Sequence, residues 1–289
     1  MLGPTATREP VQQLIYVADT LNHRIVVFDG EEWSLVPGQG GQGTEAGQFD
    51  FPCSVIADSR GWLYVTDSNN HRIQRFDGEK WEIIGIGFGP DSGQFSLPYG
   101  IAVDRDDNIW VADSTNGRLQ VWDGETWEVF ADQFERPEGV AVGRDGTIYV
   151  ADTGANRVLR YDEGSGAWTE ISQGEGEDVG QVRLPWRVAV DNDGNVYVID
   201  YSNARVQMYD GIDWSVVTHG SGFGVGQISE AYGITVDEHG MVLIADTAGH
   251  RIQTFHDGEW DVLAEGFGTE VGQFNRPRGV GVFPPSVSR

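Results

Sequence analysis

The stretch YVADTLNHRI at residues 16–25 is the most informative part of the sequence, because close copies of it recur five more times along the chain. The copies read YVTDSNNHRI (64–73), WVADSTNGRL (110–119), YVADTGANRV (149–158), YVIDYSNARV (197–206) and LIADTAGHRI (243–252). Each copy carries an Asp and, five residues later, an Arg, and successive Asp residues are 48, 46, 39, 48 and 46 positions apart. A period of this length is typical of one four-stranded β-propeller blade per repeat.

The fifth repeat shows what one unit contains. Short apolar or alternating segments at 188–191, 196–199, 206–209 and 214–217 are separated by turns rich in Asp, Asn and Gly, which predicts four antiparallel strands. No window of about 11 residues has a 3.6-residue apolar period, so we expect no helix. The sequence therefore predicts an all-β fold.

The full repeat reads P-x-G-[IV]-A-V-D, then YVADT-x-N-x-R-[IV], then a linker ending in G-Q-F-x-x-P. The linker recurs at 47–49, 93–95, 180–182, 226–228 and 272–274, whereas the linker between the third and fourth copies, at 132–134, is shorter. This pattern resembles the NHL repeat family. The resemblance covers residues 13–283 and implies a six-bladed β-propeller with four-stranded antiparallel blades.

The two ends of the chain are expected to share one blade. No inner strand of the type Pro-x-Gly-Val-Ala-Val precedes Leu14, and the missing piece, Pro277–Val282, stands at the other end. The C-terminal strand should therefore join the first blade and close the ring, which removes free sheet edges. We expect a single propeller domain at 13–283, a flexible N-terminal tail at 1–12 without the features of a signal peptide, and a C-terminal tail at 284–289.

Composition limits the partners and the compartment. The chain has 45 acidic and 19 basic residues, with a net charge of −26, and Lys80 is its only lysine. Nucleic acid binding needs clustered Lys and Arg, so nucleic acid is not an expected partner. No apolar run is long enough for a membrane span. Cys53 is the only cysteine, so no intrachain disulfide forms, and the compartment and oligomeric state stay open.

Residues shared by all repeats are expected to build the fold. Each Asp carboxylate should accept backbone N–H groups while the Arg binds the Asp or nearby carbonyls. The Trp after each Asp-Gly turn should pack between outer strands; these residues are Trp33, Trp81, Trp127, Trp168, Trp214 and Trp260.

No metal or other cofactor is expected. The turns 104–108 and 191–195 have some features of calcium loops, but every repeat needs a hairpin there and the distal Glu of an EF-hand is missing. Structural calcium stays open as an alternative. His23, His71 and His250 occupy the same loop position in three neighbouring blades, too far apart to share one zinc ion.

Function is expected where the repeats differ. The residue after the inner-strand Pro should line the channel mouth on one face, and these residues are Cys53, Tyr99, Glu138, Trp186, Tyr232 and Arg278. Arg187 follows Trp186 at a position that is Gly in most copies. Aromatic side chains with a few converging charges are typical of a ligand site, and Arg beside aromatic rings favours a carboxylate or another planar anion.

The sequence favours a binding module that recognises a small molecule, peptide or protein at this mouth. One alternative is a lyase or hydrolase using the same mouth, since an enzyme of the resembling family, the peptidyl-hydroxyglycine lyase, uses Tyr and Arg there together with zinc. No His occupies the mouth positions, however, and no G-x-S-x-G, H-E-x-x-H or P-loop motif is present, so no catalytic residue is assigned. A second alternative is a sensor or interaction domain of a longer protein.

Overall fold

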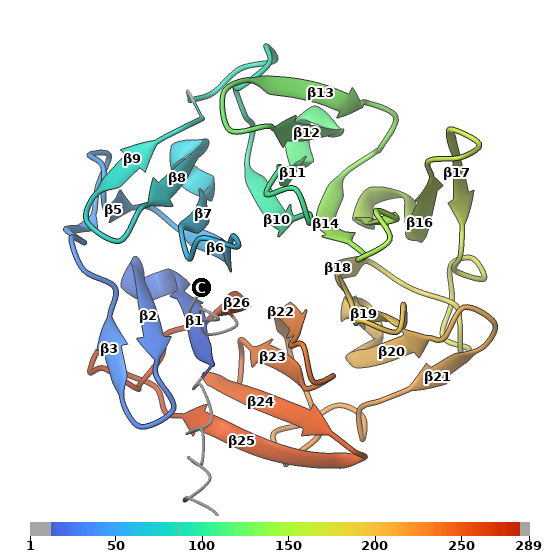
Figure 1. Cartoon of the computed structure of the whole chain (residues 1–289). Helices are drawn as coiled ribbons and strands as arrows, with labels where there is room; N and C mark the ends of the chain where they lie inside the picture. The colour runs from blue at the N-terminus through green and yellow to red at the C-terminus, as the bar shows by residue number, and fades with distance from the viewer. Residues whose placement is uncertain (1–12, 86, 284–289) are drawn as a thin grey trace, which may run out of the picture.

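The computed structural model describes residues 13–85 and 87–283, which form a ring of six four-stranded antiparallel sheets (Figure 1). The two predicted tails lie outside the described residues. Blade 1 consists of β26 (Gly279–Phe283), β1 (Leu14–Asp19), β2 (Arg24–Phe28) and β3 (Trp33–Leu35). Blade 2 consists of β6 (Pro52–Ala57), β7 (Leu63–Asp67), β8 (Arg72–Phe76) and β9 (Trp81–Ile83).

The remaining four blades follow in chain order. Blade 3 consists of β10 (Pro98–Val103), β11 (Ile109–Asp113), β12 (Arg118–Trp122) and β13 (Trp127–Ala131). Blade 4 consists of β14 (Pro137–Val142), β15 (Ile148–Asp152), β16 (Arg157–Asp162) and β17 (Ala167–Glu170). Blade 5 consists of β18 (Pro185–Val190), β19 (Val196–Asp200), β20 (Arg205–Tyr209) and β21 (Trp214–Val216), and blade 6 of β22 (Ala231–Val236), β23 (Val242–Asp246), β24 (Arg251–His256) and β25 (Glu259–Glu265).

The all-β prediction is confirmed, and the remaining elements are short. A two-stranded parallel pair, β4 (Gly41–Gln42) with β5 (Gln48–Phe49), lies in the first linker. One-turn 3₁₀ segments follow the second strand of five blades: η1 (Thr20–Asn22), η2 (Ser68–Asn70), η3 (Ser114–Asn116), η4 (Thr153–Ala155) and η5 (Tyr201–Asn203). In the described part of the chain, no helix has the length and apolar character needed to cross a membrane.

The hydrophobic core lies between the blades. Six clusters of buried side chains each draw on two neighbouring sheets, and we call each such interface a seam. In the seam between blades 5 and 6, for example, Tyr197 and Ile199 of β19 pack with Ile234 of β22 and Ile244 of β23. A single blade therefore has no core of its own, and its faces are buried only in the ring.

The ring is closed as the sequence predicts. β26 pairs antiparallel with β1, with Leu14 opposite Phe283 and Ala18 opposite Gly279. β26 lies next to β6 of blade 2 on one side, where a Cβ at Gly281 would come within 2.2 Å of the Val55 carbonyl oxygen. Glycine is thus required for the close approach of these two inner strands.

The Asp that recurs in each repeat binds the linker that leads into its own blade. Asp67 is fully buried. Its Oδ1 accepts a hydrogen bond from the backbone N–H of Asp50 (2.7 Å), and its Oδ2 accepts from Arg72 Nε (2.7 Å), Asn70 Nδ2 (2.9 Å) and Gln74 Nε2 (3.0 Å). The expected capping of N–H groups is confirmed, although the capped group belongs to the linker 17 residues upstream and not to the 3₁₀ turn that follows the Asp.

The Arg of each pair binds the same linker. The terminal nitrogens of Arg72 donate to the backbone carbonyls of Thr44, Glu45 and Gln48. We call this unit of Asp, Arg and linker the Asp–Arg clamp. Equivalent Asp–Arg contacts occur in all six blades, at Nε–Oδ2 distances of 2.7–3.0 Å.

Blade 4 has a reduced clamp. Among the described residues, Arg157 hydrogen-bonds to Asp152 alone, through Nε (3.0 Å) and Nη2 (2.9 Å), and its side chain is 34% exposed. Leu159 stands where blade 2 has Gln74. The linker into this blade is the short one, so the carbonyls that Arg72 binds in blade 2 have no counterpart here.

The repeated Trp residues pack as expected. Trp81 packs at a tilt on Phe76 of the same blade (centroids 5.1 Å apart) and edge to face with Phe49 of the linker (5.0 Å). Its Nε1 donates a hydrogen bond to the carbonyl of Pro37, just after the last strand of blade 1 (2.9 Å). Trp127 and Trp214 make the same hydrogen bond to the preceding blade. These indoles therefore join adjacent blades at the outer edge of the ring.

The loop histidines and the Asp residues of the acidic turns accept hydrogen bonds from backbone N–H groups. The Nδ1 atoms of His23, His71 and His250 accept hydrogen bonds from the N–H groups of Phe51 (3.3 Å), Leu97 (3.0 Å) and Arg276 (3.2 Å), each in a different seam. Asp104 and Asp191 accept hydrogen bonds from the N–H groups of their own turns. The predictions about metal binding stay predictions.

Ring closure generates a first testable prediction. A chain truncated after Arg276 lacks β26, so β1 loses its strand partner and the two seams flanking blade 1 are opened. We expect this truncation to aggregate or to melt far below the full-length protein in a thermal unfolding experiment. A chain truncated after Phe283 keeps β26 and serves as the control; equal melting temperatures for the two truncations would contradict closure by β26.

The clamp generates a second prediction. Asp113 is fully buried and binds Arg118 Nε (2.7 Å), whose side chain is 8% exposed. Asp113→Ala leaves a buried, unpaired guanidinium, and we expect a loss of about 3–5 kcal/mol in unfolding free energy, measured by chemical denaturation. Asp152→Ala in the reduced clamp of blade 4 should cost about 1–3 kcal/mol. A larger loss for Asp152→Ala would show that Arg burial does not set the cost.

Candidate functional site

The candidate site lies at the face where the inner strands begin, which we call the mouth. In blades 2 to 6 the ladder between the first and second strands is interrupted directly after the first residue of the inner strand. The predicted mouth residues Cys53, Tyr99, Glu138, Trp186 and Tyr232 fall in these irregularities. Since β-bulges redirect side chains, these irregularities take the non-shared side chains out of the regular pairing.

Three aromatic side chains from blades 5 and 6 form the centre of the mouth. Trp186 meets Tyr232 edge to face, with centroids 4.7 Å apart and an interplanar angle of 90°. Tyr201 lies 5.6 Å from Trp186 and 5.0 Å from Tyr232, and the two tyrosine hydroxyls are hydrogen-bonded at 2.9 Å. Tyr99 of blade 3 extends the group, 6.1 Å from Trp186. We call these four residues the aromatic cluster.

Tyr201 is not among the residues predicted at the mouth, although the sequence carries a signal for it. In five repeats the residue after the Asp is Ser or Thr, and its hydroxyl donates to the carbonyl of the Pro that opens the next inner strand. In blade 5 this residue is Tyr201, and the next inner strand opens with Ala231 in place of Pro. The hydroxyl link between blades 5 and 6 is thus replaced by the Tyr201–Tyr232 pair at the mouth.

Arg278 is the cation that lies over the aromatic cluster. Its guanidinium carbon is 4.1 Å from the centroid of Tyr232 and 4.6 Å from that of Phe51, distances typical of cation–π contacts. Within residues 13–85 and 87–283 no carboxylate lies within 4.0 Å of it. Two other arginines at this face are paired with carboxylates: Arg136 with Glu138 and Arg276 with Glu230.

Glu138 is a buried carboxyl with an altered pKa. Its side chain is 2% exposed, and Oε1 lies 3.0 Å from Arg136 Nε while Oε2 has no hydrogen-bond partner among the described residues. Burial raises the pKa of Glu138 to about 7, although Arg136, Arg187 and Arg278 all lower it. Desolvation outweighs the nearby positive charges because the carboxyl is almost completely removed from water.

Cys53 and Tyr99 adjoin Glu138. Cys53 is 1% exposed, and burial raises the pKa of its thiol. Burial, together with the nearby Cys53 and Glu138, raises the pKa of Tyr99 to about 12. Both groups therefore stay protonated at neutral pH, and a thiolate nucleophile is not favoured at this position.

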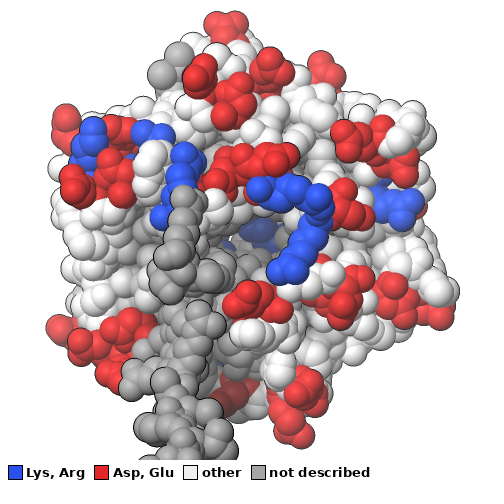
Figure 2. Space-filling view, in the orientation of Figure 1, with Lys and Arg blue, Asp and Glu red and all other residues white. Residues whose placement is uncertain are grey.

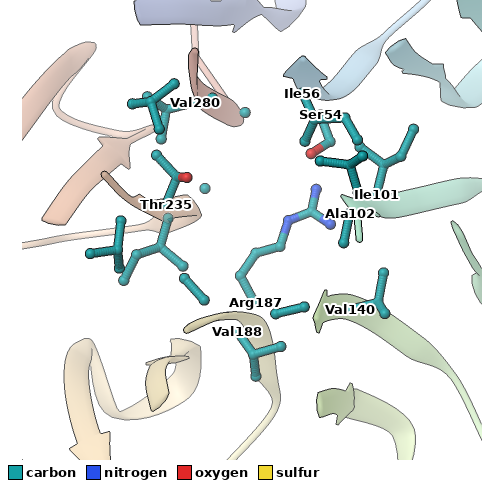
Figure 3. A pocket seen from close by; sticks show the side chains of 18 of the residues that line it. Ser54, Ile56, Ile101, Ala102, Val140, Arg187, Val188, Thr235 and Val280 are labelled. Atoms are coloured by element: carbon teal, nitrogen blue, oxygen red, sulfur yellow. The ribbon is translucent and has the colours of Figure 1, made fainter. Parts of the chain in front are cut away.

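Arg187 crosses the channel beneath the mouth. Figure 3 shows its side chain extending from β18 toward Ser54 and Ala102 on the opposite wall. Nη1 donates to the carbonyl of Glu138 (2.7 Å), and Nη2 donates to those of Tyr99 (3.1 Å) and Cys53 (3.3 Å). Arg187 thereby links blades 2, 3 and 4 to blade 5. Burial lowers the pKa of Arg187 to about 10, so the guanidinium stays charged at neutral pH.

Arg187 and Arg278, both predicted at the mouth, differ in how much of the guanidinium is free to bind a ligand. The terminal nitrogens of Arg187 are bound to the ring itself, whereas the guanidinium of Arg278 lies on the mouth without an acidic partner. The predicted contact of Arg187 with a ligand anion stays a prediction. Arg278 is the better placed of the two for such a contact.

Below Arg187 the channel is apolar. A cavity of about 230 Å³ follows the ring axis, lined mainly by aliphatic residues of the six inner strands such as Ile56, Val140, Val188 and Val280 (Figure 3). Thr235 is one of its few polar residues. Arg187 thus separates an aromatic and charged mouth from an aliphatic channel.

The chain as a whole is acidic, whereas several arginines lie at the mouth. Figure 2 shows one face of the ring, on which Asp and Glu side chains are spread widely while Lys and Arg gather at fewer places, one of them beside the central opening. In a protein with a net charge of −26, the arginines of the mouth are a local exception. Among the described residues, no three His, Cys, Asp or Glu side chains are grouped as a metal site would require.

The comparisons with known proteins agree with this architecture. The NHL repeat family matches residues 49–76, 95–122, 134–161 and 183–209. No curated protein sequence matches the chain. A solved nidogen/laminin complex contains a chain with 16% identity and a TM-score of 0.68, covering 95% of this chain and 99% of that one.

Two lyase structures are also similar. A streptogramin B lyase has 14% identity and a TM-score of 0.63, covering 95% of this chain and 88% of the lyase. A catalytically inactive virginiamycin B lyase from Staphylococcus aureus, solved with quinupristin, has 14% identity and a TM-score of 0.57, covering 79% and 73%. Identities this low show the fold alone. The four matched repeats and the closed ring of six blades identify the chain as an NHL-repeat β-propeller.

Proposed function

We propose that the protein is a binding module whose mouth recognises a peptide segment or protein surface that presents a carboxylate beside an apolar side chain. The observation that carries the proposal is Arg278, which lies over Tyr232 without an acidic partner among the described residues. Arg, Tyr and Trp are the residue types that most often dominate the energy of protein interfaces. The aromatic cluster supplies rigid apolar area around this one cation.

The charge of the chain supports a carboxylate as the recognised group. An arginine in a partly buried aromatic setting forms strong, directional hydrogen bonds to a carboxylate. The acidic surroundings disfavour a highly charged anion such as nucleic acid, because its many phosphates would be repelled. A single carboxylate next to an apolar group is compatible with both features. The similar chain in the nidogen/laminin complex is an example of this fold in a protein complex.

A second candidate function is a lyase or hydrolase activity at the same mouth, and Glu138 is the observation that favours it. Its pKa of about 7 is suited to general acid–base catalysis at neutral pH. Two similar folds belong to lyases. However, the Glu138 side chain is only 2% exposed and lies against Arg136, so a substrate would first have to displace Arg136. We therefore rank binding ahead of catalysis.

The proposed function predicts which peptides the mouth selects. On an array of immobilised peptides, wild-type protein should prefer segments with a Asp, Glu or free C-terminal carboxylate next to Leu, Phe or Tyr. Arg278→Gln should weaken the selected peptides about tenfold through the lost charge-assisted hydrogen bond. Trp186→Ala should weaken them by a similar factor through lost apolar contact.

Arg60→Gln is the matched control for this experiment. Arg60 also lies 4.1 Å from an aromatic centroid, that of Trp62, but in a turn at the opposite face. Its substitution should leave peptide selection unchanged. Equal loss in Arg60→Gln and Arg278→Gln would show that charge anywhere on the ring explains binding, and turnover of a selected peptide by wild type but not by Glu138→Gln would favour the enzyme.

The pKa of Glu138 gives a further prediction about stability. The pKa is about 7 in the folded protein against a reference value of 4.5, so the folded state binds this proton more tightly than the unfolded chain. The resulting stability is present below pH 4.5 and is lost as the pH rises through 7. Glu138→Gln removes this loss. The unfolding free energy of the variant relative to wild type should therefore rise by about 2–3 kcal/mol between pH 5 and pH 8.

Chemical denaturation of both proteins at the two pH values measures this difference. Effects of pH that both proteins share cancel when the two unfolding free energies are subtracted. Glu128→Gln, at an exposed position on β13, is the control and should show no such trend. A relative stability of Glu138→Gln that is the same at both pH values would show that the carboxyl has an ordinary pKa.

A further inference from the structure

A second cavity lies between blades 3 and 4, beside the turns at the face opposite the mouth. Its volume is about 440 Å³, larger than that of the central channel. The two turns that border it connect β10 to β11 and β14 to β15. We call it the seam pocket; it lies in the same seam as the short linker and the reduced clamp of blade 4, but at the opposite end of the strands.

Three aromatic rings form a wall of the seam pocket. Phe130 lies between Trp110 and Tyr161, with centroid distances of 4.8 and 5.1 Å and edge-to-face angles of 78° and 84°. Phe130 lies where the pairing of β12 with β13 shifts register, and its side chain is 37% exposed. A bulge thus brings a large, partly exposed aromatic side chain across the seam.

Carboxylates surround this aromatic wall. Asp104, Asp106, Asp145 and Glu163 line the pocket against one cation, Arg105. Asp145 accepts hydrogen bonds from Thr147, which lower the pKa of its carboxyl and keep it ionised. The local charge is therefore negative, and aromatic faces near carboxylates attract organic cations.

The neighbouring seam shows which group fits such a space. Between blades 2 and 3 the protein places its own guanidinium groups on aromatic rings. The guanidinium carbon of Arg75 is 4.6 Å from the centroid of Trp62 and 5.6 Å from that of Trp122, and that of Arg60 is 4.1 Å from Trp62. Arg60 also donates to the turn carboxylate of Asp58 through Nε (2.9 Å) and Nη2 (2.6 Å).

Blade 3 lacks both internal cations. Repeat alignment places Asp106 at the position of Arg60 and Val121 at that of Arg75, while Asp104 keeps the position of Asp58. Asp104 receives Trp110 Nε1 (2.9 Å) and Asn108 Nδ2 (2.9 Å) in place of a guanidinium. The seam pocket therefore keeps the turn carboxylate of Asp104, and Tyr161 supplies an aromatic ring at the position of Trp122. Asn108 stands where blade 2 has Trp62, so the second aromatic ring of the pocket comes from Phe130, and both arginines are absent.

We propose that the seam pocket binds a guanidinium group from a ligand, held against Phe130 and Tyr161 and paired with Asp106. The group would occupy the space that Arg75 and Arg60 fill one seam away. It can come from a free guanidino compound or from an arginine side chain of a peptide. This site is separate from the mouth, and the proposal does not depend on the proposed function.

The test uses three probes: N-acetyl-arginine amide, its neutral isostere N-acetyl-citrulline amide, and an acetylated, amidated pentapeptide with one central arginine among glycines. The readout is the NMR signal of the Trp110 indole N–H, assigned with Trp110→Phe. The arginine amide should shift this signal in a saturable way and the citrulline amide should not. Tighter binding of the pentapeptide than of the amide would indicate a peptide ligand, and equal binding a free guanidino compound.

Variants locate the site. Asp106→Asn and Phe130→Ala should each weaken the arginine probe about tenfold through loss of the ion pair or of the cation–π contact. Asp106→Arg places a guanidinium at the position that Arg60 has in blade 2 and should abolish binding, because it removes the pairing carboxylate and adds a like charge. Asp193→Asn is the matched control, since Asp193 has the same turn position in blade 5 and lies outside the pocket.

Three outcomes would overturn the proposal. They are the absence of any saturable shift with the arginine probes, equal binding of the citrulline amide, and undiminished binding in Asp106→Asn and Phe130→Ala. Asp106 is an exposed turn residue, so its conservative substitution should leave the fold intact, and the thermal melting curve verifies this. None of these outcomes depends on whether the mouth binds a carboxylate.

Discussion

The hydrophobic core of this protein lies between the blades, so each blade is stable only next to its two neighbours. Each of the six buried clusters belongs to two neighbouring sheets, so no blade can bury its own apolar faces. An incomplete ring would leave two of these faces in water. The pairing of β26 with β1 prevents this, and it makes the stability of every blade depend on contacts between the two ends of the chain.

The Asp–Arg clamps hold the linkers that this ring needs. A linker must cross from the outer strand of one blade to the inner strand of the next, and its carbonyls would be unsatisfied without the guanidinium of residues such as Arg72. Where the linker is short, as at blade 4, Arg157 has fewer partners, and the seam pocket lies in the same seam at the opposite face. Where the hydroxyl link is replaced by Tyr201, the aromatic cluster appears. Both candidate sites thus occupy seams where one shared contact has been exchanged.

The sequence predicts most of the fold because its signals are local and repeated. Strand positions, ring closure and the Asp–Arg pairs follow from turn chemistry and from the spacing of the copies. The prediction for the site is less complete. Sequence position places Arg187 at the mouth, but not the three carbonyls from other blades that its guanidinium binds. The direction of a long side chain in a ring depends on residues up to 134 positions away, and no local pattern encodes it.

Residues that differ between the repeats are better candidates for function than residues that all repeats share. A residue repeated in six blades is already engaged, as the carboxylate of Asp67 is with one backbone N–H and three side chains. A ligand could bind it only by breaking those contacts and exposing a buried charge. Arg278 at the mouth has no arginine counterpart in the other repeats, and Asp106 in the seam pocket has an Asp counterpart only in blades 4 and 5. Each lies next to aromatic rings, so a ligand of opposite charge can bind without dismantling the ring.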